Sequence, residues 1–220
     1  MAAEIKAQGI VIKKMAREEK GFITVMFTRS NGKISVMSKG TEKMNSRLRP
    51  SLEVFSCGCY RLIKAGSGGA YYRLAGSAAG ESFSNITSSL KRLGSAYVIA
   101  ELTDLFMQPE DPSDEVFELI ACSLRCLDTC AEDEIKAEEN RFKIKMLKVC
   151  GYDMASDTDF LSGGFLGAAE SGFLTSYSLC EGREPYGDVS HEKLGEAVDS
   201  YLAEVLGKPV NSSRFRAGLL

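Results

Sequence analysis

The sequence predicts an α+β protein, with a small β-barrel in residues 1–80 and a mainly α-helical domain in residues 81–220. Short runs of β-branched and aromatic residues fill the first part, and Gly-rich turns rather than helices separate them. Five such strands in sequence favour a closed or partly open barrel over a parallel α/β sheet. From about residue 84 the apolar residues instead follow the helical period of 3.6.

The charges are divided between the two parts. Residues 1–80 hold 14 Lys and Arg against 5 Asp and Glu, a net charge of +9, whereas residues 81–220 carry a net charge of −12. The whole-chain value of −3 hides this division. A basic module of this size indicates a polyanionic partner, because each phosphate that Lys or Arg neutralises releases condensed counterions.

Five runs are predicted as strands, at residues 8–14, 21–28, 33–38, 57–65 (one longer strand within the stretch 52–65) and 70–75. Residues 29–32 join the second and third strands as a hairpin, because Asn31-Gly32 fits a tight turn. Residues 33–38 alternate between polar and apolar, as a half-buried strand does. Residues 66–69 are a Gly-rich turn before the last strand, and residues 40–50 are predicted to be an aperiodic loop.

The basic side chains in and beside that loop are candidates for nucleic-acid contact. Lysines and arginines on a loop neutralise a phosphate backbone without reading its sequence. The alternative is a solvated loop whose charges only aid solubility. Two further cations, beside the hairpin turn, join the candidate set, which is Arg29, Lys33, Lys39, Lys43, Arg47 and Arg49.

Aromatic residues in the predicted strands are candidates for base stacking, which single-strand binders use. The set is Phe22, Phe27, Tyr60, Tyr71 and Tyr72. An aromatic residue in a strand more often belongs to the core. Because adjacent strand residues face opposite sides, the Tyr71-Tyr72 pair places one ring outside and is favoured.

The second part is predicted to hold helices at about residues 84–108, 114–130, 134–149 and 191–206, with a short one at 211–220. Pro109 ends the first, Ser113 caps the second with acidic residues in its first turn, and Ser190 caps the fourth. Residues 151–187 form a Gly-rich insert. Basic residues follow at Lys208, Arg214 and Arg216; they either complement a helix dipole or extend a DNA track.

No enzyme, metal or cofactor is predicted. Cys122, Cys126 and Cys130 share one helical face, which is either a buried stripe or part of a metal site, and a buried stripe is favoured. His191 is the single histidine, and no nucleotide-binding or nucleophile motif is present. Seven cysteines without a secretory signal, and no apolar run long enough to span a membrane, predict a cytoplasmic protein with reduced thiols.

Four segments, in order along the chain, resemble one bacterial family. They are Gly9-Ile10-Val11-Ile12 with Phe27-Thr28, Lys33 to Val36 and Lys39-Gly40; Tyr97 with Glu101-Leu102; Asn140-Arg141-Phe142 with Leu147 and Gly151-Tyr152; and Lys208-Pro209-Val210 with Ser213-Arg214. The chain thereby resembles the recombination mediator family RecO. No single segment is specific, but their order is, and it agrees with the division of charge.

The resemblance implies an OB-fold in residues 1–80 and binding of single- and double-stranded DNA. It also implies annealing of complementary strands, partnership with RecR, and binding of the C-terminal tail of the single-stranded DNA-binding protein so that RecA loads at gaps. That tail is acidic and apolar, so its site is expected to be a hydrophobic pocket rimmed by cations, with Arg125 and Arg141 as candidates. A nucleoid-associated location follows from the same resemblance.

The insert departs from the pattern of many family members. Those members carry two Cys-x-x-Cys pairs after the segment that Gly151-Tyr152 resembles, whereas residues 153–186 hold only Cys180. A zinc-free insert is therefore expected. Two other functions remain open: an OB-type adaptor that binds RNA or single-stranded DNA without mediator activity, and a thiol-dependent enzyme that uses Cys57 or Cys59. Titration with a thiol reagent tests the thiol-dependent enzyme, because a reactive cysteine has a depressed pKa.

Overall fold

A computed structural model gives the fold. It describes residues 4–17, 21–38, 48–65, 71–157, 160–161, 166–167, 170–172, 174 and 189–212. The chain forms two compact units, a barrel unit of Met1–Ser84 with Thr103–Ala121 and a helical unit of Asn85–Leu102 with Cys122–Leu220. The last strand ends at Ala79 and the first helix begins at Ser84, but Thr103–Ala121 belongs to the barrel unit.

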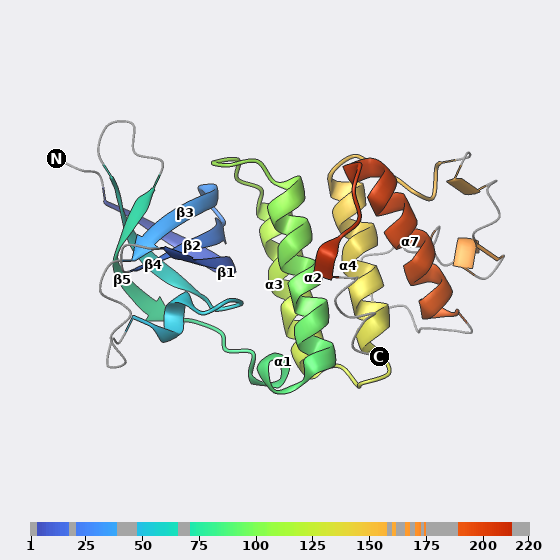
Figure 1. Cartoon of the computed structure of the whole chain (residues 1–220), viewed down its shortest axis with the longest axis horizontal. Coiled ribbons are helices and arrows are strands. Elements are labelled where there is room, and N and C mark those ends of the chain that lie inside the picture. Colours follow the sequence, from blue (N-terminus) through green and yellow to red (C-terminus); the bar gives the residue numbers. More distant parts are fainter. Residues whose placement is uncertain are drawn as a thin grey trace. The chain divides into compact units, whose positions relative to one another are not determined.

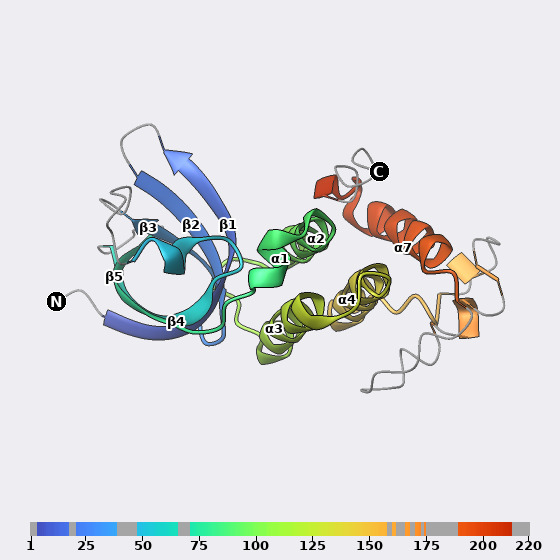
Figure 2. The ribbon, with the colours of Figure 1, turned by 90° about the horizontal axis from the view of Figure 1, so that it is seen from below.

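Five strands close the barrel in the order β1-β2-β3-β5-β4, as Figure 2 shows almost along its axis. They are β1 (Glu4–Arg17), β2 (Gly21–Thr28), β3 (Gly32–Ser38), β4 (Cys57–Lys64) and β5 (Tyr72–Ala79). The pairing of β3 with β5 is parallel and every other pairing is antiparallel. The long β1 pairs with both β4 and β2, and a register shift between Val11 and Lys13 bends it between the two. This confirms the predicted OB-like barrel.

The barrel interior is filled by alternate residues of the strands. Met26, Val36, Tyr60 and Leu62 are at most 1% exposed. The 3₁₀ turn η1 (Pro50–Leu52) adds Leu52 to this core. Within the stretch 52–65, β4 begins at Cys57, the first residue of the predicted strand, and the residues before it hold the 3₁₀ turn that starts at Pro50.

The β2–β3 hairpin follows the predicted turn. Thr28 pairs with Gly32, so the loop has three residues. Gly32 adopts a φ of +64°, in the left-handed region that favours glycine. The Thr28 hydroxyl donates to the Gly32 carbonyl (2.9 Å) and accepts from the Asn31 amide (3.2 Å). A Cβ added to Gly32 would lie 2.3 Å from the backbone oxygen of Asp111, so a second segment packs directly on this turn.

The helices are α1 (Ser84–Ser88), α2 (Leu90–Phe106), α3 (Asp114–Thr129), α4 (Ile135–Val149) and α7 (His191–Leu206), drawn in Figure 1. The single helix predicted from residue 84 is divided into α1 and α2, with Ser89 outside both, and the Asp128 carboxylate accepts from the Asn85 and Ile86 amides at the start of α1. Ser113 and Ser190 accept from backbone amides at the starts of α3 and α7, which confirms both caps. No helix in the described part of the chain is both long and apolar enough to cross a bilayer.

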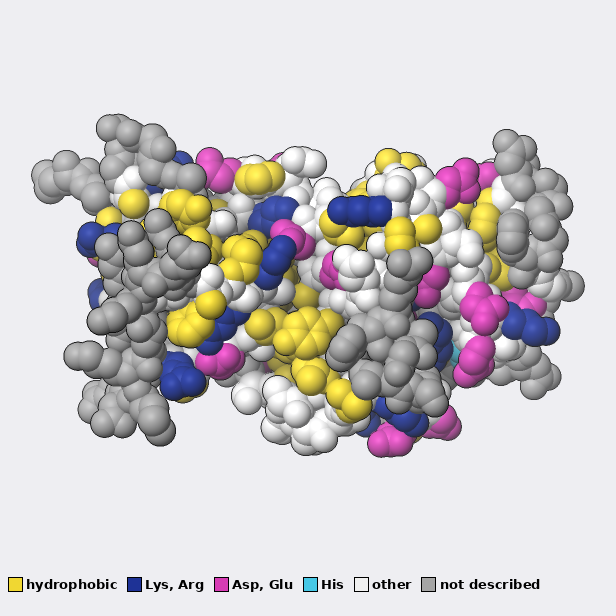
Figure 3. Space-filling model, in the orientation of Figure 1, with side chains coloured by type: hydrophobic (Ala, Val, Ile, Leu, Met, Phe, Trp, Pro, Cys, Tyr) yellow, Lys and Arg dark blue, Asp and Glu magenta, His cyan; other side chains and the backbone are white. Residues whose placement is uncertain are grey.

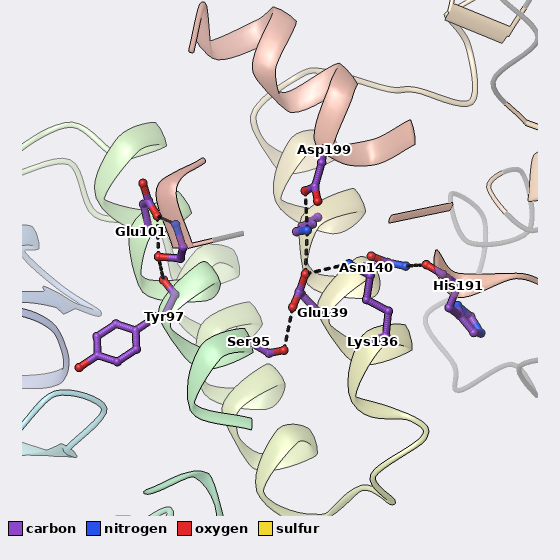
Figure 4. A network of polar contacts seen from close by, with 10 residues as sticks. Ser95, Tyr97, Glu101, Lys136, Glu139, Asn140, His191 and Asp199 are labelled. Carbon is purple, nitrogen blue, oxygen red and sulfur yellow. Dashed lines mark hydrogen bonds and ion pairs between the residues drawn. The ribbon is translucent and has the colours of Figure 1, made fainter. Parts of the chain in front are cut away.

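A buried ionic network holds α4 against its neighbours in the helical unit (Figure 4). Lys143 on α4 is fully buried, and its ammonium lies 2.8 Å from Glu139 and 2.5 Å from Asp199 on α7. Glu139, also fully buried, accepts from the Ser95 hydroxyl of α2 at 2.7 Å and pairs with Lys136 at 3.3 Å. Three helices thus contribute to one polar cluster that is satisfied only when all three are in place.

Candidate nucleic-acid interface

The sequence-predicted DNA contacts divide into two groups. Lys39, Lys43, Arg47, Arg214 and Arg216 lie outside the described residues. Arg29, Lys33 and Arg49 are described, and all three belong to the barrel unit.

Arg29 and Lys33 face carboxylates of the same unit. The Arg29 guanidinium pairs with Asp114 (3.3 Å) and Glu118 and lies 4.7 Å from the centre of the Phe117 ring. Its hydrogen bond with Glu118 raises the pKa of Arg29 above the ordinary value. The Lys33 ammonium donates to the Asp104 carbonyl and carboxylate at 2.6 and 3.1 Å. A phosphate would have to displace these carboxylates before either cation could bind it.

Residues 103–121 cover part of the β2–β3 face, which carries the ligand in many OB-folds. Phe27 follows the core residue Met26 in β2, so its side chain points away from the barrel core. It is nevertheless fully buried, and it is paired with Lys33 of β3. The Glu110 amide donates to the Lys33 carbonyl at 3.0 Å, so the covering segment is hydrogen-bonded to β3. Burial raises the pKa of Asp104, but hydrogen bonds from Lys13 and Lys33 outweigh this effect and lower the pKa overall. The Asp104 carboxylate therefore stays ionised beside the two lysines of the barrel.

The covering segment also changes the charge of the barrel unit. It contributes six Asp and Glu and no Lys or Arg. Met1–Ser84 with Thr103–Ala121 therefore holds 14 basic and 12 acidic residues, a net charge of +2 instead of the +9 of residues 1–80. A polyanion is attracted to those parts of the barrel where cations are not already paired with this segment.

One such part is a shallow hollow at the start of β2, lined by Lys14, Phe22, Ser38, Arg49 and Leu52. The Lys14 ammonium lies 4.6 Å from the centre of the Phe22 ring. It also pairs with Glu53 at 2.8 Å, and the same carboxylate lies 3.9 Å from the Arg49 guanidinium. The Arg49 side chain is 48% exposed, so the hollow combines an aromatic ring with two cations that share one carboxylate.

A second part is a strip of cations on the outer surface of β1, β4 and β5, which the sequence pattern did not reveal. Lys6 pairs with Arg61 across β1 and β4, and Arg73 pairs with Ile63 across β5 and β4. All three cations are exposed, and only Arg61 has a carboxylate near it among the described residues, that of Glu4 at 3.7 Å. The alternation of apolar and polar residues in 57–64 indicates that Arg61 faces outward. The sequence does not show which residues lie beside Arg61, because these are set by the pairing of the strands.

The aromatic candidates are mostly buried. Phe27, Tyr60 and Tyr72 are 0%, 1% and 7% exposed. Burial raises the pKa of Tyr60 well above its ordinary value. Of the favoured Tyr71-Tyr72 pair, Tyr72 is not available for stacking, because its ring belongs to the barrel core. Phe22 and Tyr71 remain partly exposed.

The candidates on the helices differ in exposure. Arg125 is exposed on α3, whereas the Arg141 side chain is only 11% exposed and lies 3.9 Å from the buried Glu138. Along the α3 stripe, Cys122 is exposed, Cys126 half-buried and Cys130 buried. No cluster of three His, Cys, Asp or Glu suited to a metal occurs among the described residues. Partial desolvation and the neighbouring Cys126 raise the thiol pKa of Cys122, and burial raises that of Cys130, which disfavours reactivity.

Two of the segments that resemble the family contact each other. The Glu101 carboxylate on α2 accepts from the backbone amides of Asn211 (3.0 Å) and Ser212 (2.7 Å), and from the Ser212 hydroxyl (2.6 Å). Burial raises the pKa of Glu101, but these hydrogen bonds outweigh it and lower the pKa overall. Val210 is buried beside them. The carboxylate thus anchors the chain immediately before Arg214 and Arg216.

The comparisons with known proteins agree with this geometry. The family model described as Recombination protein O N terminal matches residues 1–77, and the one described as Recombination protein O C terminal matches residues 87–187. A DNA repair protein RecO of Clostridium kluyveri is 28% identical over 97% of this chain and 90% of its own length.

Two further relatives carry the same name. That of Dehalococcoides mccartyi is 30% identical over 68% of this chain and 57% of its own length, and that of Clostridium perfringens is 31% identical over 70% and 61%. The matches extend over both the barrel and the helices that follow it. The chain folds into an OB-like barrel followed by helices, and the N-terminal and C-terminal models of the RecO family match these two parts in turn, so the chain belongs to the RecO family.

Proposed function

We propose that this protein is a DNA repair and recombination mediator that binds single- and double-stranded DNA through its barrel unit. It anneals complementary strands and, with RecR and the single-stranded DNA-binding protein, helps load RecA at gaps. It acts without covalent chemistry or a cofactor. The names of its relatives support the repair role. The observation that carries DNA binding is the group of exposed barrel cations that are not paired with residues 103–121, including Arg49, Lys6 and Arg73.

The mechanism follows from electrostatics. Two complementary strands repel each other through their phosphates, and cations that neutralise those phosphates lower the barrier to pairing. The acidic residues of the covering segment repel DNA from the β2–β3 side and direct it to the hollow that Arg49 lines and to the β1–β4–β5 strip. On the face drawn in Figure 3, Lys and Arg lie over the barrel, and carboxylates are more frequent over the helices.

The helical unit is proposed to bind the acidic tail of the single-stranded DNA-binding protein. Arg125 is the better placed of the two candidates, because its side chain is exposed while that of Arg141 is largely enclosed beside Glu138. The exposed thiol of Cys122 lies one helical turn before Arg125 and supplies part of an apolar border.

The test compares two triple charge reversals in the barrel unit, Lys39→Glu/Arg47→Glu/Arg49→Glu in and beside the predicted loop of residues 40–50 and Lys6→Glu/Arg61→Glu/Arg73→Glu on the strip. We expect at least one of them to weaken binding of a labelled single-stranded oligonucleotide by about 100-fold or more, since each phosphate contact adds to a steep electrostatic dependence. The same variant should lose strand annealing, measured by fluorescence energy transfer between labelled strands.

The matched control carries the same change of charge on exposed lysines of the helices, Lys91→Glu/Lys148→Glu/Lys193→Glu. It is expected to bind within a few-fold of the unaltered protein. Equal losses in all three triple variants would mean that only the total charge matters. Full binding by both barrel variants would refute the proposed interface.

Glu53 should act against DNA binding, because its carboxylate pairs with both Lys14 and Arg49. Glu53→Gln is expected to raise the affinity for the single-stranded oligonucleotide by about two- to five-fold, the range of a surface ion pair. Glu132→Gln makes the same change of charge at an exposed ion pair of the helical unit, with Lys91 at 3.9 Å. Fluorescence anisotropy at fixed salt measures both, and similar gains in the two variants would exclude a local role for Glu53.

A further inference from the structure

The hollow beside Phe22 has a composition that the rest of the described barrel lacks. It places a partly exposed aromatic ring, the ammonium of Lys14 and the guanidinium of Arg49 around one shallow depression. The floor is firm, since Leu52 and Ser38 are each 2% exposed and the Ser38 hydroxyl donates to the Phe22 carbonyl at 3.2 Å. The Phe22 ring therefore lies beside two buried residues, and Lys14 and Arg49 line the same hollow.

The other aromatic residues of the barrel do not offer this combination. Phe27, Tyr60 and Tyr72 are buried in the core or beneath the covering segment. Tyr71 is partly exposed, but no cation is placed over its ring in the described structure. Among the sequence-predicted aromatic residues, Phe22 is thus the partly exposed ring that has two cations beside it.

We propose that this hollow is a subsite for one unpaired nucleotide of single-stranded DNA, with the base stacked on Phe22 and the adjoining phosphate held by Lys14 and Arg49. This deepens the proposed DNA-binding function and rests on it. A base in a duplex is already stacked between its neighbours and cannot lie on a side chain without leaving them, so the subsite favours single strands. The remaining barrel cations contact phosphates of either form of DNA.

Glu53 occupies the position that the proposal gives to the phosphate. Its carboxylate lies 2.8 Å from the Lys14 ammonium and 3.9 Å from the Arg49 guanidinium, as a bridging anion does. Its side chain is 51% exposed and belongs to the turn after η1, so it can swing into solvent when a phosphate takes its place. The flexible Lys14 side chain then moves from the ring towards the phosphate and leaves the ring to the base.

The test uses the absence of tryptophan from the chain. Phe22→Trp introduces a single fluorophore at the proposed contact. Oligo(dT) should quench its emission as a base stacks on the indole, whereas an abasic oligomer of the same length and a duplex should leave it nearly unchanged. A second variant, Phe22→Leu, should bind oligo(dT) about five-fold or more weakly, the effect of losing one stacked base, and should bind the abasic oligomer as before.

Tyr97→Leu is the matched control, because it removes an exposed aromatic ring (44% exposed) from the helical unit. It should bind both oligomers like the unaltered protein, and circular dichroism checks the fold of each variant. If the unaltered protein binds oligo(dT) but Phe22→Trp is not quenched and Phe22→Leu binds equally well, the subsite is refuted while the proposed function stands. If the unaltered protein binds neither oligomer, the proposed function itself fails.

Discussion

Lys143→Met is expected to destabilise the helical unit by about 3–5 kcal/mol, the cost of breaking a buried ion pair from one side. Lys143 is fully buried, and its removal leaves Glu139 and Asp199 without the cation that lies 2.8 and 2.5 Å from them. Lys136 still reaches Glu139, at 3.3 Å, but it lies on the same helix and does not connect α4 to α7. Urea unfolding followed by circular dichroism measures the loss.

Lys148→Met is the control for this substitution, since Lys148 is exposed on the same helix. A surface change of this kind should alter the free energy of unfolding by less than about 0.5 kcal/mol. The double variant Lys143→Met/Glu139→Gln should recover part of the loss, because it also removes the uncompensated charge at Glu139. A loss below about 1 kcal/mol in Lys143→Met would contradict the proposed contribution of the network to stability.

Gly32→Ala is expected to destabilise the barrel unit by about 2–5 kcal/mol, through two effects. The first is the left-handed backbone, with a φ of +64°. The second is steric, since the added Cβ would meet the Asp111 backbone at 2.3 Å and neither chain can yield without breaking the hairpin or the covering segment. Thermal unfolding measures the sum.

Gly207→Ala separates the two effects. Gly207 has a φ of +65°, but no atom of the described residues lies within 4 Å of the position that an added Cβ would take. Gly207→Ala should therefore lower the free energy of unfolding by only about 1–2 kcal/mol, the cost of the left-handed backbone conformation. Equal losses at Gly32 and Gly207 would mean that residues 103–121 do not pack against the hairpin in solution, and the β2–β3 face would then be open to ligands.

Local patterns predicted most of the secondary structure. Residues 21–28 form β2 as predicted, and the caps at Ser113 and Ser190 mark the starts of α3 and α7, because strand alternation and capping depend on near neighbours. The contact between Asp128 and the start of α1 could not be predicted in this way, since the residues that it joins lie 43 and 42 positions apart. The inward orientation of Tyr72 could not be predicted either. Tyr71 and Tyr72 are adjacent, so the apolar pattern of the sequence is the same whichever of the two side chains faces the core.

The candidate interface was harder to predict than the fold. Arg29 and Lys33 were chosen as positive residues of a basic module, but their partners Asp114, Glu118 and Asp104 lie more than 70 positions away in the sequence. A count of charge along the chain cannot show that an acidic segment returns to the barrel. The strip of Lys6, Arg61 and Arg73 was missed for the same reason, since strand pairing brings together cations that are far apart in the sequence.

The most direct measurement is the salt dependence of single-stranded DNA binding by the unaltered protein and by the variant Lys39→Glu/Arg47→Glu/Arg49→Glu. A logarithmic plot of affinity against salt concentration should be steep for the unaltered protein, with a slope of about −0.7 for each phosphate neutralised. The variant should bind more weakly, and its slope should be smaller by about 2 if Lys39, Arg47 and Arg49 each contact one phosphate. Absence of binding, or an affinity that does not change with salt, would contradict a DNA-binding barrel.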